Sequence, residues 1–208
     1  MSKKIILRLF FIVFIILMII IIGQKVYIIY KINSNFYSNN YIVSVVHNNI
    51  EERKSIVLNN YIMIVNGENQ DRALYIDNNT NEKYFLNLYD ETKIKSEFNI
   101  NNTNDFLFCI PYNIITILSV NKVNFENKNY YEIVIIDGDS KIYLYYNIQN
   151  YKLEKKIYEY INLNRNESYK DYIIYYYKYN CVNPNDVNIE NYKILEEEKG
   201  FDNRWRFI

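Results

Sequence analysis

The clearest pattern of hydrophobic positions lies near the N-terminus. Every residue from Ile5 to Ile22 is apolar except Arg8. A helix needs about 20 mostly apolar residues to cross a bilayer, and an arginine one turn from the end of the run can extend its charge to the headgroups. The basic residues Lys3 and Lys4 precede the run, which favours a cytoplasmic N-terminus. The run therefore predicts a single-pass anchor in the cell membrane, with the C-terminal domain extracytoplasmic.

Two other interpretations of this run stay open. A cleaved signal peptide has an apolar region of about 7–15 residues followed by small residues at the cut site, whereas isoleucines occupy 20–22. A buried core helix is the other alternative. Gly23 is followed by Gln24 rather than Cys, so lipid attachment through a cysteine is not available there.

After the anchor, the hydrophobic pattern changes to that of short strands. Helical spacing of apolar residues continues to Phe36, and polar breaks rich in Asn then separate apolar stretches with strand composition. Asp137-Gly138-Asp139 gives the strongest hairpin signal. The predicted strands are 41–46, 55–58, 61–65, 73–76, 83–88, 92–98, 130–136, 141–146, 153–161 and 171–179.

One stretch interrupts the strands with a helical pattern. Asn104-Asp105 predicts the cap of a short helix that ends at Cys109, and Pro111 suits the first turn of a second helix. Ile114, Ile115 and Leu118, with Ile117 as a further candidate, would form an apolar stripe on this second helix, which we expect to pack onto the sheet.

The order of elements predicts an α+β fold. An N-terminal transmembrane helix is followed by a curved antiparallel sheet, an unclosed half-barrel, with covering helices near 25–36 and 104–120. Residues 1–24 form the cytoplasmic stub and anchor, and residues 25–208 form one extracytoplasmic domain. The chain contains only 4 Gly and 2 Pro, so no linker between domains is visible.

Composition and charge narrow the classes of partner. The formal net charge is +0, so no basic excess indicates nucleic acid. Tyrosine is unusually abundant, with 24 residues, and tyrosine and isoleucine favour half-buried strands.

Few residues suggest chemistry. His47 is the only histidine, and a lone histidine after a strand is typical of a structural residue. Asp137 and Asp139 fit a turn better than a calcium loop or an acid–base pair. Cys109 and Cys181 either form a disulfide or remain separate thiols. We therefore expect no catalytic residue, no metal and no cofactor.

Tyrosine stripes are the remaining candidates for a site. Tyr143 and Tyr145 share one face of a predicted strand, and Tyr175 and Tyr177 share a face of another. Such stripes either pack against covering helices or line a ligand site. We treat these four tyrosines as the candidate ligand-binding residues.

Three segments of the second half carry a resemblance to a known family. They are Asn129-Tyr-Tyr-Glu-Ile-Val, the run from Lys141 to Ile157, and the Tyr-rich run from Tyr172 to Val187, which contains Asn180-Cys-Val. Together they resemble the LolA-like superfamily of periplasmic lipoprotein carriers, and within it the branch of spore germination lipoproteins. That branch has a lipid-modified Cys where this chain has Gln24.

The resemblance implies a curved sheet with an apolar hollow. In carriers of this family the hollow holds acyl chains, and in other relatives the domain is a docking module. The resemblance implies no enzyme activity.

Three functions follow as hypotheses. The first is a membrane-anchored extracytoplasmic binding module that docks a partner protein or an apolar or lipid ligand, in spore germination or envelope maintenance. The second is a structural envelope or spore assembly protein without a ligand, whose sheet edges pair with other chains. The third is an extracytoplasmic hydrolase, which would require carboxylates or a cysteine close to His47.

Overall fold

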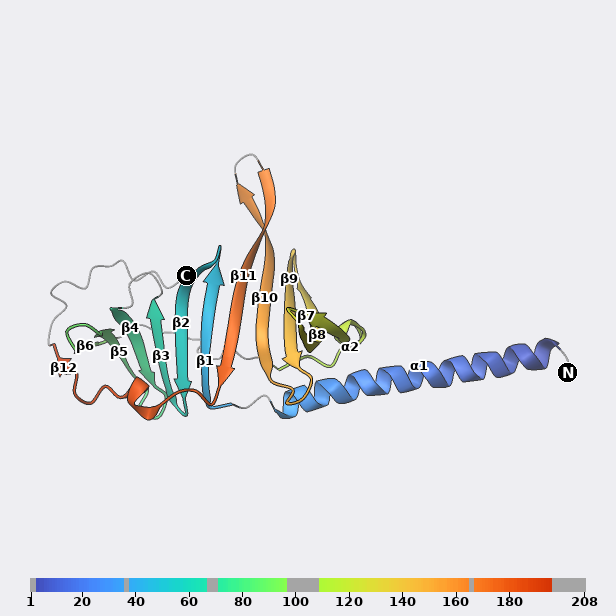
Figure 1. The fold of residues 1–208 in the computed structure, drawn as a ribbon, viewed down its shortest axis with the longest axis horizontal. Helices are drawn as coiled ribbons and strands as arrows, with labels where there is room; N and C mark the ends of the chain where they lie inside the picture. The colour runs from blue at the N-terminus through green and yellow to red at the C-terminus, as the bar shows by residue number, and fades with distance from the viewer. Residues whose placement is uncertain (1–2, 36–37, 67–70, 97–108, 165–166, 196–208) are drawn as a thin grey trace. The chain divides into compact units, whose positions relative to one another are not determined.

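A computed structural model describes residues 3–35, 38–66, 71–96, 109–164 and 167–195, and Figure 1 shows its fold. These residues form one long helix, one short helix, a 3₁₀ helix and twelve strands. The helices are α1 (Lys3–Ser34), α2 (Ile114–Ser119) and η1 (Pro184–Val187). The strands are β1 (Asn40–His47), β2 (Ile50–Leu58), β3 (Tyr61–Asn66), β4 (Arg72–Asp77), β5 (Glu82–Asn87), β6 (Thr92–Lys95), β7 (Asn121–Phe125), β8 (Lys128–Asp137), β9 (Ser140–Asn147), β10 (Leu153–Asn164), β11 (Glu167–Tyr179) and β12 (Lys193–Ile194).

The strands form one unclosed mixed sheet, in the order β12-β6-β5-β4-β3-β2-β1-β11-β10-β9-β8-β7. The prediction of an α+β fold with a helix and a sheet is confirmed. The prediction of a purely antiparallel sheet is wrong at one end, because β12 pairs with β6 in parallel. β12 does not follow β6 through a hairpin. It comes from the C-terminal segment, where Lys193 N–H donates to Glu91 O and Leu195 N–H donates to Lys93 O.

The chain divides into two compact units. Unit 1 contains Met1–Tyr37 and Leu107–Tyr172, and unit 2 contains Ser38–Phe106 and Ile173–Ile208. The sequence predicted one extracytoplasmic domain from residue 25 onward, and that division stays a prediction. The predicted boundary between residues 24 and 25, which concerns the membrane surface, stays a prediction.

Tight turns in this glycine-poor chain depend mainly on asparagine. Among the described residues, Asn occupies six of the nine non-glycine positions that have positive φ, namely Asn48, Asn49, Asn59, Asn81, Asn127 and Asn180. Asparagine tolerates the left-handed region better than other residues with a side chain. The hairpin predicted at Asp137-Gly138-Asp139 is confirmed, and Gly138 provides its positive φ of 58°.

The strands and the C-terminal segment of unit 2 form its core. Side chains from β2 to β5 pack against the segment that contains η1. This cluster consists of Ile56, Met63, Ala73, Tyr75, Leu86, Val182, Val187 and Ile189. The consecutive residues Ala73, Leu74, Tyr75 and Ile76 of β4 are all buried. Because neighbouring side chains of a strand point to opposite faces, both faces of β4 are covered.

Unit 1 contains strands β7 to β10 and α1, whose C-terminal end carries its buried residues. Ile29 and Ile32 of α1 are buried, as are Ile133 of β8 and Leu144 of β9. The chain just before α2 joins this core through Ile110. The C-terminal end of α1 is therefore packed within unit 1.

The expected packing of the α2 stripe is wrong. Ile114, Ile115 and Leu118 are 59%, 66% and 52% exposed, Ile117 is half-buried, and the buried residue of α2 is Thr116, at 3%. Helix α2 begins at Ile114, where Asn113 caps it by accepting from the N–H of Thr116. Ser119 lies one turn after Thr116 on the same side of α2 and accepts from the N–H of Val134 of β8, so the polar side of the helix faces the sheet. The predicted helix between Asn104 and Cys109 lies outside the described residues, except for Cys109, which is not helical.

Candidate functional site

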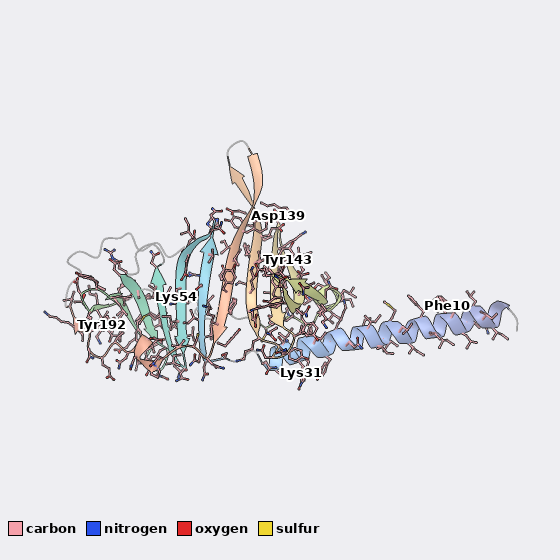
Figure 2. The ribbon with its side chains drawn as sticks, in the orientation of Figure 1. Phe10, Lys31, Lys54, Asp139, Tyr143 and Tyr192 are labelled. Carbon is pink, nitrogen blue, oxygen red and sulfur yellow. The ribbon has the colours of Figure 1, made fainter. Side chains whose placement is uncertain are left out.

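The N-terminal part of α1, from Ile5 to Ile21, leaves its apolar side chains exposed. The stretch Ile5–Ser34 is long and apolar enough to cross a membrane, and none of its most apolar window is buried in the protein. Figure 2 labels Phe10 on this part of the helix, where its side chain is 69% exposed. Soluble monomeric proteins rarely expose a continuous apolar surface of this size to water. The helix therefore fits a membrane anchor or a signal sequence.

Hydrogen bonds join the C-terminal end of α1 to the rest of unit 1. Asn33 Nδ2 donates to the carbonyl oxygen of Ile110 over 3.0 Å, and Ile110 N–H donates to Asn33 Oδ1 over 2.9 Å. Eight residues earlier, Lys25 Nζ donates to the carbonyl oxygen of Leu118 over 2.8 Å. These bonds tie two points along α1 to the α2 segment, which restricts rotation of unit 1 about the helix.

Tyr143, the first candidate ligand residue, belongs to a polar network at the surface of unit 1. Figure 2 labels its side chain on β9. Its hydroxyl donates to Glu159 Oε2 over 3.2 Å, and Lys170 Nζ lies 2.8 Å from Glu159 Oε1. The hydrogen bond from Lys170 lowers the pKa of Glu159 below its usual value. Desolvation, followed by the charge of Glu159, raises the pKa of Tyr143.

Tyr145, the second candidate, is part of the aromatic core of unit 1. Its ring stacks on Phe125 with 4.8 Å between centroids and meets Tyr130 edge-on at 5.9 Å. Burial is the main cause that raises the pKa of its hydroxyl, and a hydrogen bond with Glu132 adds to it. The Tyr145 side chain is thus occupied by its own neighbours.

Tyr175 and Tyr177 lie in unit 2, on the part of β11 that pairs with β1. Tyr177 is opposite Val43 and is buried, while Tyr175 is opposite Val45 and is half-buried. The four candidate residues therefore fall into two pairs, one in each unit. In each pair one tyrosine is buried, Tyr145 or Tyr177, and the other is partly accessible.

A buried lysine in unit 1 was not singled out from the sequence. The Lys155 side chain is only 6% exposed, pairs with Glu126 Oε1 at 2.7 Å and lies 4.6 Å above the ring of Phe125. A buried ammonium group requires such a partner because its desolvation is costly. The adjacent lysines at 155 and 156 were the available signal, since neighbouring strand residues point to opposite faces.

His47 has a carboxylate neighbour. Its Nδ1 lies 2.9 Å from Glu52 Oε1, and its Nε2 lies 3.4 Å from Nδ2 of Asn48. A carboxylate that orients an imidazole is one component of hydrolytic sites. These two partners supply a carboxylate and an amide, and neither of them is a hydroxyl or a thiol.

The remaining candidates have structural positions. Asp137 ends β8 and pairs with Ser140 across the hairpin turn. Cys109 and Cys181 are free, exposed thiols. Within the part of the chain that the structure describes, no group of three or more His, Cys, Asp or Glu residues could hold a metal ion.

Comparisons with known proteins add no family to this description. No family model matches the chain, and no curated protein matches it with significance.

Proposed function

We propose that the chain is a single-pass membrane protein that presents an extracytoplasmic binding module to a protein partner. The observation that carries this proposal is the attachment of α1 to the rest of unit 1. A carrier that moves a ligand between sites benefits from release or from a flexible tether. Here the buried Ile29 and Ile32 and the two hydrogen bonds between Asn33 and Ile110 favour a module held at a fixed height above the membrane.

The tyrosines favour a protein partner over an acyl ligand. An acyl site needs an apolar hollow that its own side chains leave open. Tyr145 packs against Phe125 and Tyr130, and Tyr177 is buried. Binding of an acyl chain in a LolA-like sheet is the second candidate, since Tyr143 and Tyr175 keep partial exposure. A role in germination or envelope maintenance stays an expectation from the resemblance.

The terminal strands argue against assembly through sheet edges. β12 contains two residues, and β7 contains five, with the sequence Asn-Lys-Val-Asn-Phe. Short edges with polar or charged side chains are a common protection against pairing with other chains. We therefore rank the structural assembly protein below the binding module.

Photo-crosslinking in the native membrane tests this proposal. A benzoylphenylalanine in place of Tyr89, which is 86% exposed, or of Ile194, which is 63% exposed, should give an adduct with a different protein. The same group in place of the fully buried Leu86 is the matched control for reaction within the chain. Adducts only between copies of the chain would favour the assembly protein. The absence of protein adducts, together with acyl chains that copurify in native mass spectrometry, would favour the carrier.

The two exposed cysteines test the orientation. A membrane-impermeant maleimide added to intact cells should label Cys109 and Cys181 of the full chain, because the domain is expected on the outer side. Extraction with alkaline carbonate should leave the chain in the membrane. Labelling only after lysis would contradict the orientation, and release by carbonate would contradict the anchor.

A further inference from the structure

Helix α2 shows an inverted distribution of polar and apolar residues. Ile114, Ile115 and Leu118 are more than half exposed, whereas Thr116 is buried. A helix on the surface of a protein in water normally has the opposite arrangement. A small cluster of exposed aliphatic residues on a helix indicates contact with an apolar phase or a partner.

The position of α2 identifies that phase. The hydrogen bond between Lys25 Nζ and Leu118 O places α2 beside Lys25 of α1, within the same compact unit. Twenty residues separate Ile5 from Lys25, and at 1.5 Å per residue they span about 30 Å. That distance equals the thickness of the hydrocarbon core of a typical bilayer. If the hydrocarbon core begins at Ile5, Lys25 and α2 lie where it ends.

The chemistry around α2 is that of a membrane interface. Tyr27 and Tyr30 of α1 and Tyr112 before α2 are all exposed, and tyrosine is enriched at the headgroup level of membrane proteins. The sequence contains no carboxylate between Asp105 and Glu126 and none before Glu51. Acidic groups, which anionic lipids would repel, are therefore missing from the sequence of both segments.

We infer that α2 is a second point of membrane contact, which inserts Ile114, Ile115 and Leu118 into the interface of the leaflet where α1 leaves the bilayer. This inference rests on the proposed membrane anchor. The occupant of the exposed face is the lipid surface itself, because the hydrogen bond from Lys25 Nζ to Leu118 O holds α2 at the end of the apolar stretch of α1. Two attachment points fix the tilt of unit 1 as well as its height above the membrane.

Quenching of tryptophan fluorescence by brominated lipids tests this inference on the full chain. The chain has one tryptophan, Trp205, which Trp205→Phe removes. In that background, Ile115→Trp reports on α2, and Ile136→Trp is the matched control, because Ile136 is 62% exposed at the end of β8. Phe14→Trp reports on insertion of the span itself. The vesicles contain phosphatidylcholine and phosphatidylglycerol, with bromine near the headgroup end or deeper in the acyl chains.

We expect lipids brominated near the headgroup end to quench the Ile115→Trp variant several-fold more than the Ile136→Trp variant. Deeply brominated lipids should quench the Phe14→Trp variant most. Circular dichroism of each variant checks that the strands are retained.

Three outcomes would overturn the inference, and they are distinguishable. Quenching of the Phe14→Trp variant without quenching of the Ile115→Trp variant would overturn the α2 contact and leave the anchor intact. No quenching of the Phe14→Trp variant would overturn the anchor and the α2 contact together. If the tryptophan of the Ile115→Trp variant is protected from aqueous acrylamide but is not quenched by lipid, protein rather than lipid covers α2.

Discussion

The two units solve the same burial problem with different parts of the chain. In unit 2 a sheet is covered by the segment that follows it, through Val182, Val187 and Ile189, and β4 is buried on both faces. In unit 1 the buried residues include Ile29 and Ile32 of α1, the same helix that carries the long apolar stretch. Unit 1 therefore takes part of its buried apolar surface from α1, whereas the described core of unit 2 contains no residue of α1.

The two units also differ in how they treat apolar side chains outside their strands. Unit 1 leaves Ile114, Ile115 and Leu118 of α2 exposed beside α1. The C-terminal segment of unit 2 buries Val182, Val187 and Ile189 on the strands, and a capping box between Asn183 and Asp186 satisfies hydrogen bonds within the segment. Coupling between the membrane and the fold is therefore expected in unit 1.

The largest expected effect comes from removing α1 entirely. A chain that begins at Ser38 lacks Ile29 and Ile32, and burial of each such side chain contributes about 1.5–3 kcal/mol. That loss is large beside a domain stability of about 5–15 kcal/mol. In hydrogen exchange, β8 and β9 should lose protection while β3 and β4 keep theirs.

A chain that begins at Lys25 is the matched control for this truncation. It lacks the apolar stretch before Lys25 but keeps Ile29 and Ile32 of α1, so β8 and β9 should remain protected. If β8 and β9 are equally protected in the chain that begins at Ser38, the C-terminal end of α1 contributes nothing to the core of unit 1. The contrast between the two units then disappears.

A smaller effect is expected from the side-chain bridge between α1 and the α2 segment. Asn33→Leu removes both hydrogen bonds to the backbone of Ile110, which is buried. Leaving a buried donor and acceptor without partners costs about 1–3 kcal/mol. Urea unfolding of the full chain in detergent should show this loss of stability.

Asn35→Leu is the control for that substitution. Asn35 is exposed, and its side chain bonds locally, to the carbonyl oxygen of Lys31. Its replacement should change stability by no more than about 0.5 kcal/mol. Equal effects of the two substitutions would show that the bridge does not hold α1 to the α2 segment.

The sequence predicted the described strands well where alternation and turn residues agreed. The strand predicted at 61–65 is β3, and the strands predicted at 130–136 and 141–146 are β8 and β9, joined by the expected turn. Two strands were not predicted. β12 has only two residues, and β7 carries only Val123 and Phe125 as apolar residues, so neither has enough alternation to produce a signal.

The candidate site was less predictable because periodicity does not reveal what covers a face. Alternation correctly placed Tyr143 and Tyr145 on one strand, but the packing of Phe125 on Tyr145 depends on β7, which the pattern did not predict. Likewise, the spacing of Ile114, Ile115 and Leu118 predicted an apolar stripe but not its direction. A stripe that faces lipid and one that faces a core have the same period.

A matched polar network allows a finer comparison of the units. In unit 1 Glu159 accepts from Tyr143 and pairs with Lys170, and in unit 2 Glu82 accepts from Tyr84 and pairs with Lys95. The bond with the lysine is the first cause that lowers the carboxyl pKa in both cases. The Glu159 side chain is 12% exposed and that of Glu82 is 40% exposed, so water screens the second network more.

The smallest expected effect is therefore a difference in acid sensitivity between two glutamate substitutions. A carboxyl whose folded pKa is lowered stabilises the fold above its ordinary pKa of about 4.3, and this contribution is lost as the pH falls through the folded pKa. Glu159→Gln should lower stability at neutral pH and flatten its decline below about pH 4. Glu82→Gln should do the same to a smaller extent, because its network is more exposed. Urea unfolding at a series of pH values measures both, and a larger effect of Glu82→Gln would mean that exposure does not rank the two networks.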